Sequence, residues 1–211
     1  MRDTFRSRLS AGNGSTTRQT VTLGQYHAAM DTALIVPRLP AGEHYLLRPW
    51  ELGDLPLVRE ASQDAYIPLI TTVPPEYSPA AGEAFIRRQW DRAASGSGYP
   101  FLIIRRHDGR PIGNIGLWLK ELSAGRASVG YWLAASARGQ GAAAPALQAV
   151  ADWALTDLQI PRIHLYVEPW NVASQRTAEY AGFEREGLLR SWQRVGEQRR
   201  DMIVYSRIKT H

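Results

Sequence analysis

The stretch VGYWLAASARGQGAA, residues 129–143, joins a strand-like run to an apolar-striped helix. Two glycines at such a junction let the backbone turn sharply and approach a ligand closely. The helix that follows directs unpaired N–H groups and the positive end of its dipole into this turn. Small residues at 142–144 leave those groups open, and Arg138 can add a guanidinium. The stretch therefore predicts a cradle for a diphosphate.

The segments around this turn predict a mixed α/β fold. Three strands are expected before it, and their short Gly-containing connections indicate an antiparallel meander, at residues 99–106, 110–119 and 126–134. A helix with apolar residues at helical spacing follows the turn, and then a strand at 162–167. The turn thus carries the only βαβ crossover that the sequence predicts.

The two ends of the chain complete this prediction. A first strand is expected at 45–50, followed by a helix that Asp54 caps and a second helix that begins with Ser78-Pro79. After the crossover we expect a helix over 171–181, closed by Gly182. The remaining expected strands lie at 183–194 and 199–208.

Composition excludes several classes of protein. The chain has no Cys, which removes disulfides, thiolate metal sites and a cysteine nucleophile, and no metal site is predicted. Residues 1–40 hold +3 of the net charge of +5, so the body is nearly neutral and no nucleic-acid partner is expected. No apolar run is long enough for a bilayer, and nothing in the chain points away from the cytoplasm. Residues 1–33 are expected to be a mobile basic extension and residues 34–211 the folded domain.

The glycine turn also has two other interpretations. The first is a tight turn without a ligand, because two glycines before a helix are common. The second is a dinucleotide site, since residues 139–144 satisfy G-x-G-x-x-A and Glu168 ends the next strand. The preceding strand, however, belongs to a meander, and only 43 residues follow Glu168, too few for a second mononucleotide half.

Several motifs in order resemble the GNAT acyltransferases, specifically their RimJ/RimL-type branch. Arg138, Gly141 and Ala143 match the pyrophosphate loop R/Q-x-x-G-x-G/A of that family. The resemblance spans about residues 34–208 and continues through LRPW at 47–50, VEPWNVAS at 167–174, GFEREG at 182–187 and DMIVYS at 201–206.

The resemblance implies a central, mostly antiparallel, splayed sheet flanked by helices, with acetyl-CoA lying between two diverging strands. Backbone groups of Trp132–Ala134 would pair with the pantetheine arm, and N–H groups at 140–144 would hold the pyrophosphate. The residues assigned to the coenzyme are Trp132, Leu133, Ala134, Arg138, Gly139, Gln140, Gly141, Ala142, Ala143, Ala144, Asn171 and Ser174.

Catalytic residues are expected near the thioester. Many relatives place a Tyr, the acid for the thiol, where this chain has Ala178, so Ser174 is the leading contact for the sulfur. Tyr180, on the same helix, is expected to pack. Some relatives carry a Glu where this chain has Gln193, which leaves Glu168 as the main candidate for the base and Glu121 as another. The residues assigned to the acceptor side are Asn114, Trp118, Tyr131, His164 and Gln193.

The function expected from the resemblance is transfer of an acetyl group from acetyl-CoA to a primary amine, by direct attack in a ternary complex. The acceptor is a protein N-terminus or a small-molecule amine, no membrane partner is expected, and a homodimer is left open. Because Ala178 and Gln193 depart from the family pattern, a coenzyme A-binding sensor without catalysis is the alternative.

Overall fold

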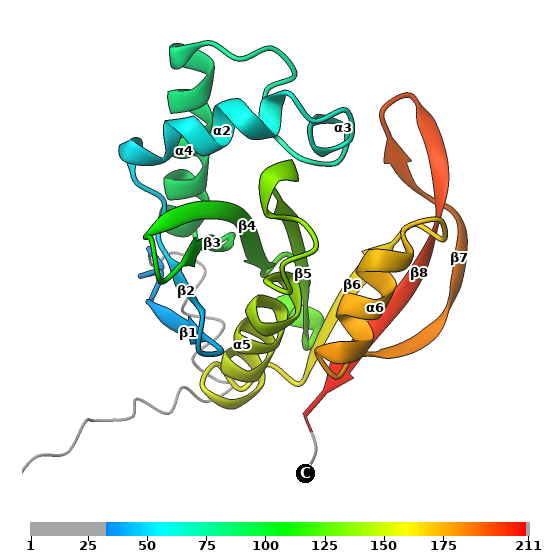
Figure 1. Ribbon diagram of the computed structural model, residues 1–211. Helices are drawn as coiled ribbons and strands as arrows, with labels where there is room; N and C mark the ends of the chain where they lie inside the picture. Colours follow the sequence, from blue (N-terminus) through cyan, green and yellow to red (C-terminus); the bar gives the residue numbers. More distant parts are fainter. Residues whose placement is uncertain (1–32, 210–211) are drawn as a thin grey trace, which may run out of the picture.

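The computed structural model describes residues 33–209 and contains one eight-stranded sheet with helices on both faces (Figure 1). The helices are α2 (Leu55–Ser62), α3 (Ile67–Ile70), α4 (Pro79–Ala94), α5 (Ala143–Thr156) and α6 (Val172–Tyr180). The strands are β1 (Leu39–Ala41), β2 (Tyr45–Arg48), β3 (Gly98–Arg105), β4 (Arg110–Trp118), β5 (Arg126–Leu133), β6 (Arg162–Val167), β7 (Glu184–Val195) and β8 (Gln198–Ile208). The predicted N-terminal extension, residues 1–33, lies outside the described residues apart from Ala33.

The strand order is β1-β2-β3-β4-β5-β6-β8-β7, and every neighbouring pair is antiparallel except β5 and β6. The predicted meander and the single predicted crossover are confirmed. The parallel pairing is short, because Arg126–Ser128 pair with Arg162–His164 and the two strands then separate. Figure 1 shows the resulting V between β5 and β6, so the splayed sheet expected from the resemblance is present.

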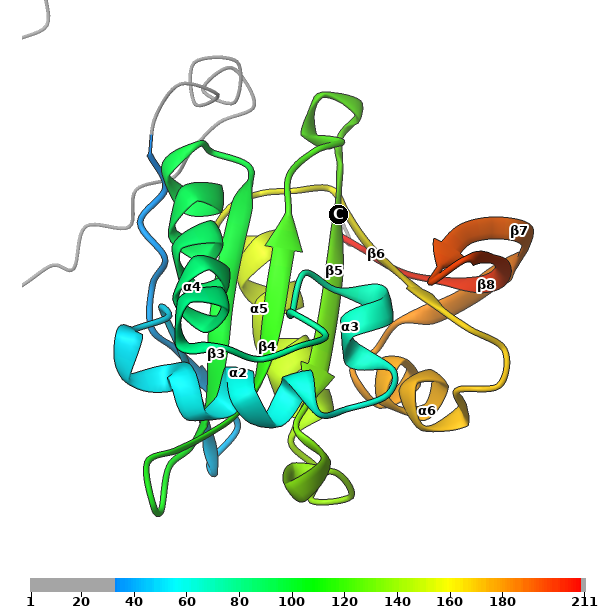
Figure 2. The same cartoon turned by 90° about the horizontal axis from the view of Figure 1, so that it is seen from above.

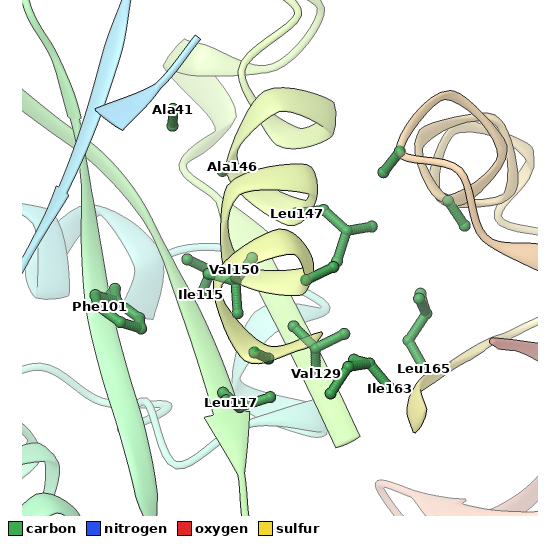
Figure 3. Close-up of a cluster of buried hydrophobic side chains, with 14 of the residues drawn as sticks. Ala41, Phe101, Ile115, Leu117, Val129, Ala146, Leu147, Val150, Ile163 and Leu165 are labelled. Atoms are coloured by element: carbon green, nitrogen blue, oxygen red, sulfur yellow. The ribbon is translucent and has the colours of Figure 1, made fainter. Parts of the chain in front are cut away.

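Two hydrophobic cores hold the layers together. Helices α5 and α6 cover one face of the sheet, called here the α5 face, and α2 and α4 cover the opposite α4 face (Figure 2). On the α5 face, Leu147 and Val150 of α5 pack against strand residues such as Val129 and Leu165 (Figure 3). On the α4 face the core is centred on Trp50 and Phe85, whose rings meet edge to face at 5.2 Å.

Of the two residues predicted to cap the first two helices, Ser78 makes the capping hydrogen bond and Asp54 does not. Ser78 caps α4, since its Oγ accepts from the N–H of Ala81 at 3.1 Å. The prediction that Asp54 caps the first helix is wrong, because its side chain makes no capping bond there. Its carboxylate instead accepts from both terminal nitrogens of Arg48, at 2.8 and 2.6 Å, and from the N–H of Glu51 at 2.8 Å.

Two short elements were not predicted. Strand β1 is three residues long and begins a hairpin with β2, and α3 is a single turn. Neither is long enough to show a hydrophobic period in the sequence, so only packing against longer elements reveals them. None of the helices in the described part of the chain is both long and apolar enough to cross a membrane.

The Arg48–Asp54 pair is expected to contribute strongly to stability, because Asp54 is only 2% exposed. Replacing Asp54 with Ala should lower the free energy of unfolding by about 3 kcal/mol, since the Arg48 guanidinium, 13% exposed, then keeps only Glu51 at 3.7 Å as a charged partner. Urea denaturation followed by tryptophan fluorescence measures this change. The control is Glu83→Ala, which removes an exposed partner 3.8 Å from Arg87 and should cost less than about 0.5 kcal/mol. Equal losses in the two variants would contradict this role of Asp54.

Candidate active site

The glycine turn forms a cradle of backbone N–H groups where β5 leads into α5. Gly139 and Gly141 have φ angles of +74° and +76°, which are in the left-handed region that favours glycine. Among residues 33–209, none of the backbone N–H groups from Gly139 to Ala144 donates a hydrogen bond. The first turn of α5 has neither a capping side chain nor an acidic residue. The protein therefore leaves both the donors and the positive end of the helix dipole available to an anion.

Neighbouring residues hold this cradle in place. The hydroxyl of Tyr45 donates to the carbonyl of Gln140 at 2.8 Å, and Arg105 donates to the Gln140 amide oxygen at 2.9 Å. A Cβ built on Gly139 or Gly141 would meet no atom within 4 Å, so open space lies in front of both residues. A diphosphate fits these features, because it needs convergent N–H donors, positive potential and room.

Arg138 connects the cradle to the segment between α2 and α3. Its guanidinium contacts Asp64 at 2.5 Å, and its Nε donates to the carbonyl of Leu133 at 3.2 Å. Burial alone would raise the pKa of Asp64, but the N–H groups of Ile67 and Tyr66 and the Arg138 guanidinium outweigh it and hold that pKa below its usual value. Arg138 is therefore already paired, and its predicted phosphate contact would use the remaining donors of a half-exposed side chain.

Not all of the backbone groups predicted to pair with the pantetheine arm lie on the open edge of β5. The N–H of Ala134 donates to the carbonyl of Ile112 at 2.9 Å and so faces β4. Because successive residues of a strand direct their backbone groups to alternate edges, Tyr131 and Leu133 face the V whereas Trp132 faces β4. Of the three predicted residues, Leu133 is the one whose backbone faces the V, and its N–H is the group left open there because its carbonyl accepts from Arg138 Nε.

On the α5 face, the start of α6 lies beside the open arm of β5. Asn171 caps α6, because its Oδ1 accepts from the N–H of Ser174 at 3.0 Å. The hydroxyl of Tyr131 donates to Ser174 Oγ at 3.1 Å. Side chains alternate along β5, so Tyr131, which is assigned to the acceptor side, points to the α5 face beside Ser174. Its contact with the acceptor stays a prediction. Tyr180, which was expected to pack, is 81% exposed.

On the α4 face, small residues of β4 and β5 lie beside the closed end of the V, namely Gly116, Ser128 and Gly130. Trp118, Ser128 and His164 lie in one row across β4, β5 and β6, at the point where the parallel pairing ends. The Trp118 ring lies over Gly116, since a Cβ there would meet that ring at 2.1 Å. Gly130 is beside the ring, with 3.9 Å between Trp118 Nε1 and a Cβ built on that glycine. A molecule approaching from this side can therefore come close to the backbone of β5.

A cavity of about 360 Å³ opens next to this row. It is lined by Glu121, Arg126, Arg162, His164, Tyr166, Trp192 and Val204. His164 is 3% exposed, its Nε2 is 3.5 Å from a carboxylate oxygen of Glu121, and its buried Nδ1 has no partner among the described residues. Burial lowers the pKa of His164, so the imidazole is neutral at pH 7.

Two of the predicted acceptor residues do not line this cavity. Gln193 lies in the β7–β8 hairpin and is not a lining residue, whereas its neighbour Trp192 is. Asn114 is buried, and its Oδ1 accepts from the Trp50 indole at 3.0 Å, so it is tied into the α4-face core.

Glu168 follows β6 at the open end of the V and is 5% exposed. One of its oxygens accepts from the Tyr66 hydroxyl at 2.5 Å, and the other accepts from the Trp170 indole at 2.8 Å. Burial and the adjacent Glu168 carboxylate raise the pKa of Tyr66, so its hydroxyl stays protonated. Arg200 of β8 lies 4.0 Å from the same carboxylate. Sequence reasoning missed Tyr66, because it is 102 residues from Glu168 along the chain and no motif marks it.

The α4-face side of the V is also bordered by a contact between two distant segments. A Cβ built on Gly196, in the β7–β8 turn, would lie 3.5 Å from Leu69 of α3. Figure 1 shows the tip of the hairpin and α3 facing each other across the V. Within residues 33–209, no group of three or more His, Asp or Glu side chains could hold a metal ion.

Comparison with known proteins identifies the class to which this site belongs. The family described as "Acetyltransferase (GNAT) domain" matches residues 44–184. Because this match covers more than half of the chain, the protein belongs to the GNAT acetyltransferase family. The resemblance inferred from the sequence motifs is thereby confirmed.

Individual relatives agree with this assignment. The chain is 28% identical to the uncharacterized N-acetyltransferase p20 of Bacillus licheniformis over 167 residues, 79% of this chain and 94% of the relative. A solved structure of Mycobacterium smegmatis RimJ in complex with CoA-disulfide is 27% identical, with a TM-score of 0.69 over 81% of this chain and 84% of that chain. A putative ribosomal-protein-serine acetyltransferase from Vibrio cholerae, 22% identical, shares the fold with a TM-score of 0.70 over 84% of this chain and 99% of that chain.

Proposed function

We propose that this protein transfers the acetyl group of acetyl-CoA to a primary amine by direct attack, with both substrates bound at the V. The observation that carries the proposal is the set of free N–H groups from Gly139 to Ala144 at the start of α5, beside the unpaired edge of β5. These groups suit the pyrophosphate of the coenzyme, and the backbone of Leu133 suits its pantetheine arm. Acetyl-CoA supplies a thioester carbonyl that a neutral amine attacks.

Ser174 and Tyr131 are proposed to protonate the departing sulfur. Since Tyr131 donates its hydroxyl hydrogen to Ser174 Oγ, the Ser174 hydrogen remains available to point into the V. Burial raises the pKa of Tyr131 and outweighs the opposite effect of the Ser174 and Thr177 hydroxyls, so this phenol stays protonated and can replace the proton that Ser174 gives up. The pair takes the place of the tyrosine that the family pattern puts at Ala178.

Glu168 is proposed as the group that accepts the proton of the amine, through a water molecule. Each of its oxygens uses one lone pair, toward Tyr66 and Trp170, and keeps another. Its place at the end of β6, on the α4-face side, puts it opposite Ser174. Negative charge that develops on the thioester oxygen would be stabilised by the N–H groups that β5 directs into the V.

The alternative is a coenzyme A-binding sensor that does not catalyse transfer. Gln193 and Ala178 motivate it, since both replace groups that act in relatives. The Tyr131–Ser174 contact favours the enzyme, because it supplies a hydroxyl donor where the family tyrosine is missing. Tight binding of coenzyme A without acetylation of any amine would favour the sensor.

The cradle can be tested with Gly141→Ala. A methyl group there blocks the open space, and alanine must adopt a φ of +76°. Unfolding should become about 1–2 kcal/mol easier, and coenzyme A should bind roughly tenfold more weakly in calorimetry. Coenzyme A should also raise the melting temperature of the wild-type protein.

The matched control is Gly109→Ala, in a hairpin turn with a φ of +68° and similarly open space. It should cost the same stability and leave coenzyme A affinity unchanged. If both variants bind coenzyme A like the wild type, the glycine turn is not the pyrophosphate site.

The proton donors can be tested by removing their hydroxyls. Ser174→Ala should lower kcat by about 100-fold with little change in the Kd for acetyl-CoA, because general acid catalysis contributes about 10²–10⁴-fold. Tyr131→Phe should lower kcat as well, and the double variant should lose less than the sum of the two free-energy changes, because the hydroxyls act as one chain. Ser95→Ala, at an exposed position after α4, is the control. Additive effects would argue against the relay.

The role of Glu168 is distinguished by measuring kcat and KM separately. Glu168→Gln should lower kcat by about 100-fold with little change in KM, since an amide cannot accept the proton of the amine. Tyr66→Phe keeps the carboxylate and should retain most of kcat. A Glu168→Gln variant with an unchanged kcat and a raised KM would show that Glu168 only positions Tyr66 and Trp170.

A further inference from the structure

Two arginines on successive turns of α4 converge above the α4 face. The guanidinium carbon of Arg92 lies 4.9 Å from the centre of the Trp118 ring, and its Nη2 donates to Thr72 Oγ1 at 3.3 Å. Arg88 donates from its Nη2 to the carbonyl of Thr72 at 2.9 Å. Both cations thus meet the α3–α4 loop at one residue.

The charge of this pair is not balanced by the protein. Across residues 33–209, neither Arg88 nor Arg92 has a carboxylate within 4.0 Å, and Arg88 Nε is buried without a partner. Like charges four residues apart on a helix repel each other. Burial and the charge of Arg88 lower the pKa of Arg92, and a nearby negative charge would offset both effects.

The two arginines that line the cavity beside His164 are balanced. Arg126 contacts Glu121 at 2.9 Å, and Arg162 forms a two-pronged ion pair with Glu186. The cavity beside His164 is therefore a charge-balanced environment, whereas the α4 side of the same face carries two unneutralised cations.

The arginine pair lies near the closed end of the V. Trp118, beneath Arg92, lies in the row with Ser128 and His164 where the V closes. Neighbouring strands are about 4.8 Å apart, so the Cα atoms of Trp118 and His164 are roughly 10 Å apart. An acceptor with its amine in the V would therefore have to extend across Trp118, at the closed end, to reach the arginines.

We propose that Arg88 and Arg92 form a subsite for a carboxylate or phosphate group of the acceptor, so that the preferred acceptor is an amine that carries an anion. This inference rests on the proposed function, because it assigns the acceptor of the same site. Both guanidiniums present planar sets of N–H donors that match carboxylate and phosphate oxygens. Trp118 supplies an apolar surface between the anion and the amine.

The test is a set of amines matched in chain length, assayed with acetyl-CoA and the full-length protein. ω-Amino acids and aminoalkyl phosphates carry the anion, amino alcohols lack it, and diamines replace it with a cation. We expect kcat/KM to be at least tenfold higher for one of the anionic series than for the alcohols, and lowest for the diamines. The better of the two anionic series identifies the source of the charge.

Variants connect this preference to the two residues. Arg88→Gln and Arg92→Gln should each raise KM for the anionic amine by about tenfold or more and leave KM for the amino alcohol unchanged, and Arg92→Lys should retain part of the preference. Arg87→Gln is the control, because that neighbouring side chain is 60% exposed and pairs with Glu83. The rise in melting temperature with coenzyme A verifies that each variant is folded.

The outcomes separate this inference from the proposed function. Transfer to amines without preference for the anionic series, or a preference that survives both glutamine variants, would overturn the anion subsite alone. Absence of transfer from the wild-type protein to every amine, together with coenzyme A binding, would overturn the proposed function and this inference with it.

Discussion

The separation of β5 from β6 is the constraint on which the rest of the site depends. β5 is paired with β4 along Gly113–Trp118, and β6 is paired with β8 along all six of its residues, so each strand is held by its outer neighbour. Between them the pairing ends at Ser128 and His164. Backbone groups beyond that point have no strand partner and must be satisfied by something else. The fold therefore presents a sheet edge inside the molecule, where an extended ligand can complete it.

Contacts from one small region stabilise both arms of this V. The segment between α2 and α3 reaches the β5 side through Asp64, which pairs with Arg138, and the β6 side through Tyr66, which donates to Glu168. The two contacts start two residues apart and end on opposite arms. Burial strengthens them, since both carboxylates are nearly excluded from water. The segment just before α3 thus links the glycine turn to the end of β6.

Much of the fold was predictable, because its signals are local. The bounds of β6 match the prediction, the strands of the meander agree to within a residue, and Ser78 caps α4 as expected. Asp54 shows the limit of such reasoning: an acidic residue before a helix usually caps it, but a buried Arg48 competes for the same carboxylate. The glycine turn was recognised from two glycines and a helix, while the pairing of Arg138 with Asp64 depends on residues 74 positions apart.

The sequence by itself determined the family, the crossover and the cradle, because each follows from short motifs in a set order. Only the tertiary structure decided on which face of the sheet each side chain lies and which residues it meets there. Tyr131 joins Ser174 on the α5 face because side chains alternate along β5, and Tyr66 joins Glu168 because α3 folds against the end of β6. Likewise, the sequence contains many arginines, but only the structure shows which of them lie beside a carboxylate. Arg126 and Arg162 do, whereas Arg88 and Arg92 do not. Charge balance is a property of neighbours in three dimensions, and the order of residues along the chain does not contain it.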